Sequence, residues 1–354
     1  MSYHSVRSFR LTRERYLFFD IFRKGPLIIL VCPAYSPQFT DFGSIRIRDP
    51  IGRREYARTL SLIRVENEPF AVLAFRGVDP QARRAPVTVL YKGARAHFLL
   101  PKEPATTKKL LVQTTLMKSD YRLIRMFYPY YRAQGVEHFY MYYNGRITPE
   151  IAKEFAKPGV TLVPWNFPYW NRLPWVKWEP SHEGTSLTGT PLRHHAQMGQ
   201  MHHALYKYGK GQADYMIFND LDEYMHIKGL TLRERVADKK YTTYIFHNRW
   251  AKTLDGKIPH TFPRKFYCGG RGDHPWQSKC IHKTDVTMSI YIHSYRDRTD
   301  GSNAPSEEQE HFHFHNWGSK HRIPAHLVPE DRRQWTHGDT IVELDKLAAG
   351  GKES

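Results

Sequence analysis

Three acidic residues follow one apolar run near the middle of the chain, in YMIFNDLDEYMHI at 215–227. Carboxylates packed as closely as Asp220, Asp222 and Glu223 repel one another and lose hydration, so a positive charge should lie beside them. In an extended segment Asp220 and Asp222 point to the same side, because side chains alternate with a period of two. Their hard oxygens suit Mn²⁺ or Mg²⁺, with open positions that nucleotide phosphates can fill. The alternative is that these acids cap a loop or pair with nearby Arg and Lys.

A second candidate metal centre is HFHFHNW at 311–317. If this segment is extended, His311, His313 and His315 lie on one face, with a spacing suited to Zn²⁺ or iron. The alternative is a half-buried strand edge. The helix-like run LRHHAQMGQMHHAL contains no H-E-x-x-H pattern, so we interpret its histidines as packing or hydrogen-bonding groups.

The common nucleotide-binding and hydrolase motifs are absent. Neither G-x-x-x-x-G-K-[ST] nor a G-x-G-x-x-G between strand and helix occurs, so a bound nucleotide would be held through a metal and basic side chains. The G-x-S-x-G of α/β-hydrolases is also missing.

Composition and charge limit the class of protein. The 354 residues are 40% hydrophobic and 25% charged, which is typical of globular domains. A net charge of +18 predicts attraction to anions, but no block of five or six basic residues indicates a nucleic-acid arm. We therefore do not expect nucleic acid as a partner, and peripheral membrane contact is compatible with the charge. Three cysteines without paired spacing fit a reducing compartment.

No signal peptide and no apolar run long enough to span a bilayer is visible in the sequence. We therefore expect a cytoplasmic or peripheral membrane protein.

Two regions differ in their sequence pattern. Residues 1–105 contain short alternating segments separated by turn residues, which predicts a β-rich module. From 110 to 342 strand and helix patterns alternate, and this favours an α/β fold with a mostly parallel sheet flanked by helices. Ligands in such sheets bind beyond the carboxyl ends of the strands, where DLDEY is expected. Residues 343–354 are predicted to be a disordered tail.

Two segments resemble glycosyltransferase family 92 and its relatives. They are TTLMKSDYRLIRMFYPYYRAQGVEHFYMYYNG and QMHHALYKYGKGQADYMIFNDLDEYMHI, which occur in the family's order and spacing. SKCIHK, IYIHSY and FHFHNW are similar to its weaker downstream elements. KSD stands where the family has K-N-E, and HNW stands where it has H-Y. The resemblance covers about residues 110–318.

This resemblance implies a GT-A-like, Rossmann-type domain that binds a nucleotide sugar, most simply a UDP-sugar. It implies that Asp220 and Asp222 hold Mn²⁺ or Mg²⁺ against the donor diphosphate and that His315 is a third metal or phosphate contact. The donor-binding residues implied are Thr115, Lys118, Tyr143 and Asn144 at two strand ends, Gln197 on a helix, and Asp220.

The reaction implied is inverting sugar transfer to a glycan acceptor. The metal stabilises the leaving diphosphate, and a separate carboxylate takes the proton of the acceptor hydroxyl. Asp273 in GGRGDHPW is our first candidate for this base and Asp255 in AKTLDGK the second, although both also fit ordinary turns. Two alternative functions are a histidine-ligated metalloenzyme built on 311–315 and a basic module that binds RNA or membrane.

Overall fold

The computed structural model of the chain divides into two compact units. Unit 1 comprises Met1–Tyr3, Lys108–Val163 and Gly209–Ser354, and unit 2 comprises His4–Thr107 and Pro164–Tyr208. The structure describes residues 2–3, 6–12, 16–33, 41–64, 70–104, 106–168, 170–171, 193–255, 257–269, 278–292, 298–299, 302–306, 309–314, 317 and 340–343.

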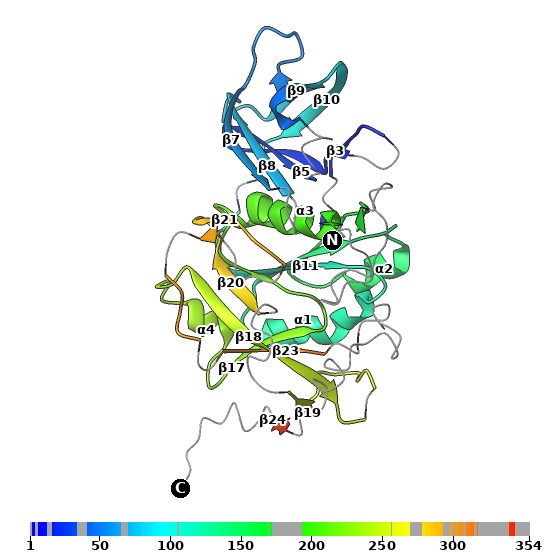
Figure 1. Cartoon of the computed structure of the whole chain (residues 1–354), viewed down its shortest axis with the longest axis vertical. Coiled ribbons are helices and arrows are strands. Elements are labelled where there is room, and N and C mark those ends of the chain that lie inside the picture. Colours follow the sequence, from blue (N-terminus) through cyan, green and yellow to red (C-terminus); the bar gives the residue numbers. More distant parts are fainter. Residues whose placement is uncertain are drawn as a thin grey trace, which may run out of the picture. The chain divides into compact units, whose positions relative to one another are not determined.

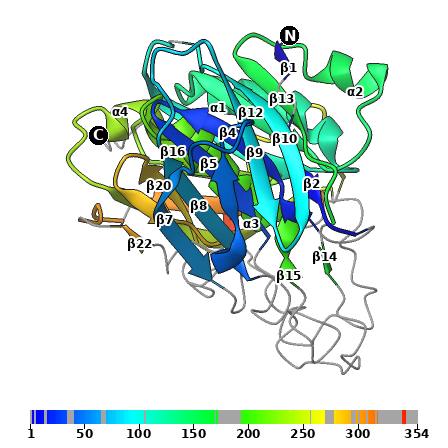
Figure 2. The same cartoon turned by 90° about the horizontal axis from the view of Figure 1, so that it is seen from above.

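Unit 2 contains the β-rich region expected at the start of the chain. Its four-stranded antiparallel sheet has the order β4-β5-β8-β7, and Figure 2 shows these strands side by side. Their bounds are Asp20–Lys24, Leu27–Cys32, Phe70–Arg76 and Ala57–Arg64. A second sheet has the order β10-β9-β6, with bounds Ala94–Pro101, Arg84–Tyr91 and Arg46–Arg48. Short pairs are formed by β2 (Phe9–Arg10) with β3 (Tyr16–Phe18) and by β14 (Trp170–Asn171) with β15 (Arg193–His194).

The helix α3 (His195–His203) contacts the strands β5 and β8, and a π-helical turn follows at Ala204–Gly209. This segment belongs to unit 2 as far as Tyr208. A Cβ at Gly199 would lie 2.4 Å from the ring of Phe19, so glycine permits this close approach. The sequence pattern placed this helix within the region 110–342.

A buried charge cluster joins the helical segment of unit 2 to its first strands. The carboxylate of Asp20, fully buried, accepts hydrogen bonds from Lys207 Nζ at 2.7 Å and from the backbone N–H of Arg7 at 2.6 Å, and it lies 2.8 Å from His203 Nε2. Burial alone would raise the pKa of Asp20, but Lys207 and His203 outweigh it and hold that pKa far below its usual range.

Unit 1 is built on one large mixed sheet (Figure 1). The described strands follow the order β1-β13-β12-β11-β16-β20-β18-β19-β24, and β23 pairs with both β18 and β17. Their bounds in that order are Ser2–Tyr3, Val160–Pro164, His138–Tyr143, Lys109–Met117, Ala213–Phe218, Lys279–Lys283, Thr243–Thr253, Lys265–Cys268 and Thr340–Glu343, with β23 at Gln309–His313 and β17 at Glu223–Ile227. A separate pair is formed by β21 (Thr287–Ser289) and β22 (Arg298–Thr299).

The direction of the strands changes across this sheet. β12, β11 and β16 run parallel, whereas β20 is antiparallel to both β16 and β18, and β19 is antiparallel to β18. The prediction of parallel strands is correct for the first part, and the sheet as a whole is mixed. The α/β class is confirmed.

Local sequence signals explain the helices of unit 1. Helix α1 (Ile124–Ala133) ends before Gly135, whose φ of +86° is a left-handed conformation that glycine adopts without strain. Helix α2 (Pro149–Glu154) begins at Thr148, whose side chain accepts from the backbone N–H of Ile151. Helix α4 (Leu232–Val236) begins with a capping box formed by Thr231 and Glu234.

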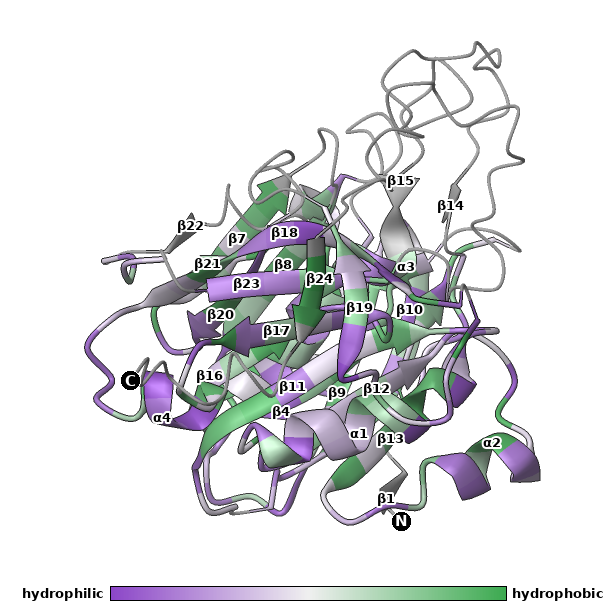
Figure 3. Cartoon of the chain, turned by 90° about the horizontal axis from the view of Figure 1, so that it is seen from below, coloured by the Kyte–Doolittle hydropathy of each residue, from purple (hydrophilic) through white to green (hydrophobic). Residues whose placement is uncertain are grey.

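Polar and apolar strands are mixed within the large sheet. Figure 3 colours β18 and β23 largely as hydrophilic, whereas β24 is hydrophobic. Yet His311 on β23 and Asn248 on β18 are buried, at 0% and 2% exposure. Polar side chains in the interior need partners or a ligand, so this part of the sheet marks the candidate site.

Cysteines and membrane-spanning elements add two facts. Cys32, Cys268 and Cys280 are all buried. Across the parts of the chain that the structure describes, none of the helices has the length and hydropathy needed to span a bilayer.

Candidate functional site

The carboxyl ends of three parallel strands meet at the acidic segment. Thr114 on β11 pairs in register with Phe218, the last residue of β16, and Met117 on β11 pairs with Tyr143, the last residue of β12. Asp220 therefore follows β16 at the edge where β11 and β12 also end. The predicted position of the acidic cluster at a strand end is confirmed.

The acidic segment is a turn between two strands. β16 ends at Phe218, and β17 begins at Glu223, whose N–H donates to the carbonyl of Asp220 at 3.2 Å. The expectation of an extended segment through Asp222 was wrong, because the chain reverses here to start β17. Alternation therefore does not set the directions of the carboxylates. Asp220 and Glu223 both face Lys279, whereas Asp222 faces His313.

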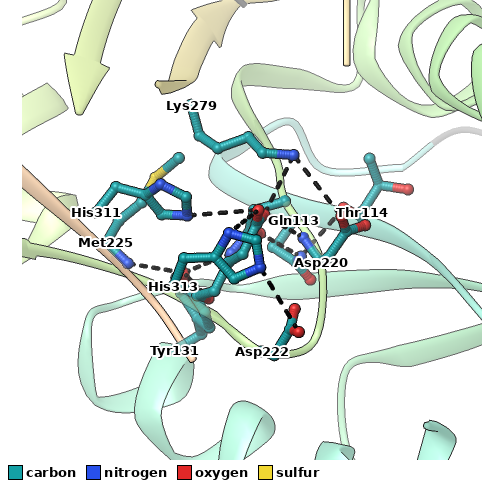
Figure 4. Close-up of polar contacts among 11 residues, drawn as sticks. Gln113, Thr114, Tyr131, Asp220, Asp222, Met225, Lys279, His311 and His313 are labelled. Carbon is teal, nitrogen blue, oxygen red and sulfur yellow. Dashed lines mark hydrogen bonds and ion pairs between the residues drawn. The ribbon is translucent and has the colours of Figure 1, made fainter. Parts of the chain in front are cut away.

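Glu223 is the buried carboxylate of the cluster, with 2% of its side chain exposed, and we call it closed for that reason. Its Oε2 lies 3.2 Å from Lys279 Nζ and accepts from the N–H of Asp220 at 2.7 Å. Its Oε1 lies 3.7 Å from both His311 and His313 (Figure 4). Burial alone would raise the pKa of Glu223, but Lys279 and then His311 outweigh it and hold that pKa well below the usual range.

Lys279 supplies the positive charge that the acidic sequence requires. It is the first residue of β20 and is 3% exposed. Its ammonium lies 3.8 Å from Asp220 Oδ2, in addition to its contact with Glu223 (Figure 4). Burial disfavours the ammonium, but Glu223 and Asp220 outweigh this and raise the pKa of Lys279.

Asp220 is the most open of the three acids, with 37% of its side chain exposed. The crowding of its carboxylate by protein atoms raises the pKa of Asp220 above the usual value. Lys279 opposes this rise in the pKa, and Glu223 and Asp222 add to it.

Asp222 faces a histidine instead of the lysine. Its Oδ2 lies 3.7 Å from His313 Nε2, and its side chain is 15% exposed. Burial lowers the pKa of His313, but the contact with Asp222 outweighs it, so that pKa is raised. The ring of Trp250 on β18 stacks against His313, with centroids 4.6 Å apart.

The two described histidines of the second candidate centre lie on one side of β23, as predicted. His311 and His313 contact the same oxygen of Glu223, and their rings are 6.0 Å apart. Burial lowers the pKa of His311, partly offset by Glu223. His315 lies outside the described residues. The structure therefore places the histidine and acidic segments in one site.

A buried hydrogen-bond network holds the acidic turn in place. Asn219 Nδ2 donates to Tyr131 Oη and to the carbonyl of Glu223, both at 2.7 Å, and its Oδ1 accepts from Gln113 Nε2 at 2.8 Å. Tyr131 Oη also donates to the carbonyl of Glu223 and accepts from the N–H of Met225. Helix α1 and strand β11 thereby fix the backbone on both sides of Asp220.

The predicted donor-binding residues of unit 1 lie on or next to β11 and β12. Thr115 is buried, and its hydroxyl has no hydrogen-bond partner among the described residues. Lys118 is exposed, and its N–H donates to Asp120. Tyr143 and Asn144 are buried, and the N–H of Asn144 donates to the carbonyl of Met117 at 2.8 Å, which joins the two strand ends.

The remaining predicted residues lie elsewhere. Gln197 is buried on α3, within unit 2. Asp255 is exposed in a turn after β18, where its Oδ1 accepts from the N–H of Lys257 at 3.0 Å. Asp273 lies outside the described residues.

The donor set fits a metal held jointly with a bound phosphate. No group of three or more His, Cys, Asp or Glu among the described residues could hold a metal ion by itself. Glu223 is closed and paired with Lys279, which leaves the partly exposed carboxylates of Asp220 and Asp222. Two carboxylates suit Mn²⁺ or Mg²⁺ only if other oxygen ligands complete the shell.

Sequence reasoning missed two residues of this site. Glu223 was noted only as part of the acidic cluster, and Lys279 only as part of the run SKCIHK. The available signal was a lysine at the start of a strand whose next residues, Cys280 and Ile281, are buried.

A family model described as glycosyltransferase family 92 matches residues 112–343, well over half of the chain. The match begins within β11 and ends with β24, and it contains Asp220, Asp222, Glu223 and Lys279. No curated protein matches the chain.

Proposed function

Because the chain belongs to glycosyltransferase family 92, we propose that it transfers a sugar from a nucleotide sugar, with UDP as the nucleotide, to a glycan acceptor. We include Mn²⁺ or Mg²⁺ in this proposal. The observation that carries it is the pair of partly exposed carboxylates, Asp220 and Asp222, at the edge where β11, β12 and β16 end. A GT-A-like arrangement of unit 1 is part of the same proposal.

Each residue at and beside the acidic turn has a proposed role that follows from its surroundings. Asp220 and Asp222 would hold the metal, which stabilises the negative charge of the leaving diphosphate when bound. Glu223 anchors Lys279 and the backbone of Asp220. We propose Thr115 and Asn144 as nucleoside contacts beside them, because both are buried polar residues at the same sheet edge.

Other parts of the proposal extend beyond the acidic turn. Lys118 and Tyr143 are proposed for the nucleoside side, Gln197 for the donor and His315 for the metal or phosphate. We propose an inverting reaction, in which a carboxylate takes the acceptor proton. Asp273 remains our first candidate for this base and Asp255 the second. The net charge of +18 supports peripheral contact with an anionic membrane.

The first experiment is thermal unfolding against a panel of nucleotides and nucleotide sugars, with and without Mn²⁺. The wild type is compared with Asp220→Ala/Asp222→Ala. A ligand at a hundred times its Kd stabilises the folded state by about 2.7 kcal/mol, which raises Tm measurably.

The matched control is Asp238→Ala, which removes an exposed carboxylate of unit 1 from a turn, where its Oδ1 accepts from the N–H of Lys240 at 3.1 Å. A shift that requires Mn²⁺, that the double variant loses and that the control keeps would support the donor site. If no nucleotide shifts the wild type, the proposed donor site is refuted.

A further inference from the structure

The ammonium of Lys279 lies between a closed carboxylate and an open one. Glu223 is 2% exposed and holds the ammonium at 3.2 Å, whereas Asp220 is 37% exposed and lies at 3.8 Å. Lys279 itself is 3% exposed. Its charge is therefore anchored on the closed side and shared with the open side, where a second cation would have to bind (Figure 4).

The anchoring prevents Lys279 from leaving when another cation arrives. Glu223 Oε2 is also held by the N–H of Asp220 at 2.7 Å, and the carbonyl of Glu223 is held by Tyr131 and Asn219. A metal that approaches Asp220 alone therefore meets a fixed positive charge within a few ångströms, which repels it.

A diphosphate reverses this balance. Its negative oxygens attract both the ammonium and the metal, so repulsion between the two cations is offset only when the phosphate is present. Thermodynamic linkage then requires the metal to tighten diphosphate binding by the same factor.

We propose that Lys279 makes metal binding at Asp220 and Asp222 conditional on the donor diphosphate. This inference rests on the proposed function, and it assigns Lys279 a positioning role that neither the family match nor the acidic motif assigns. Without nucleotide, Lys279 neutralises the site. With nucleotide, Lys279 and the metal share the phosphate charge.

The test measures Mn²⁺ binding with and without UDP, through the electron paramagnetic resonance signal of free Mn²⁺. A titration without protein corrects for binding of Mn²⁺ to UDP. The main variant is Lys279→Met/Glu223→Gln, which removes the ammonium together with the carboxylate it neutralises and so keeps the net charge. Lys239→Met is the matched control, because Lys239 pairs with Asp214 at the opposite end of β16.

We expect UDP to tighten Mn²⁺ binding to the wild type by about tenfold or more. The double variant should bind Mn²⁺ about tenfold more tightly than the wild type without UDP, and the further gain from UDP should be smaller than in the wild type. Glu223→Gln alone should bind Mn²⁺ more weakly than the wild type, because Lys279 then pairs only with Asp220. The control should match the wild type.

If the double variant responds to Mn²⁺ and UDP as the wild type does, the role of Lys279 is refuted while the proposed function stands. If the wild type binds no Mn²⁺ even with UDP, the metal-dependent function itself fails. Should the double variant not fold, Lys279→Gln is read by the same criteria.

Discussion

Replacing Asn219 by alanine should loosen the acidic turn by an amount that the structure predicts. The side chain makes three buried hydrogen bonds, to Tyr131, to the carbonyl of Glu223 and from Gln113. Each is worth about 1 kcal/mol net. Every partner keeps another hydrogen bond, since Gln113 also donates to the carbonyl of Thr114 and Tyr131 also donates to Glu223. We therefore expect a loss of about 3 kcal/mol, without the larger penalty of orphaned groups.

Hydrogen exchange followed by mass spectrometry measures this loss within unit 1. Peptides from β11, β16 and β17 should lose protection by roughly a hundredfold, because each 1.4 kcal/mol or so is a factor of ten. Asn303→Ala, which truncates an exposed asparagine of the same unit, should leave their protection unchanged. A loss below about fivefold in the Asn219→Ala variant would show that the network does not hold the turn, and would refute this reasoning.

Two further predictions concern buried polar groups. Asp20 has a lower pKa in the folded than in the unfolded state, so its contribution to stability is present above the unfolded value of about 4 and is lost as the pH falls below it. Asp20→Asn should cost about 3–5 kcal/mol near neutral pH, because Lys207 is left buried and unpaired. The gap between variant and wild type, measured by exchange in β4 and β5, should shrink between pH 5 and pH 2, and a constant gap would contradict the assignment. Asn248 is 2% exposed, and neither atom of its amide has a hydrogen-bond partner among the described residues. Asn248→Leu should therefore raise the free energy of unfolding of unit 1 by about 1 kcal/mol, and a fall in exchange protection of β18 would show that the amide has a partner after all.

Local sequence rules were sufficient for most individual elements. Thr148 with Pro149 is a local signal for the start of α2, and Gly135 is one for the end of α1, because caps and left-handed residues act within a few positions of the chain. The apolar run 215–218 predicted a strand with acids at its end, which is β16 followed by Asp220. Signals of this kind depend on neighbours in sequence, so the sequence contains them completely.

The pairing of strands that lie far apart in the sequence could not be predicted from such local signals. The strand β7 (Ala57–Arg64) and the strand that begins at Glu223 were not expected, and the large sheet becomes antiparallel beyond β16. The partner of a strand depends on which apolar faces can be buried together, and this is a property of the whole chain.

By itself, the sequence determined that an acidic cluster ends a buried strand and that a cation must offset its charge. Only the tertiary structure decided which cation lies there in the folded chain. Lys279 reaches Glu223 and Asp220 because β20 pairs with β16, although Lys279 follows Glu223 by 56 positions in the sequence. Burial then makes this contact strong, since charges removed from water must find a partner at short range.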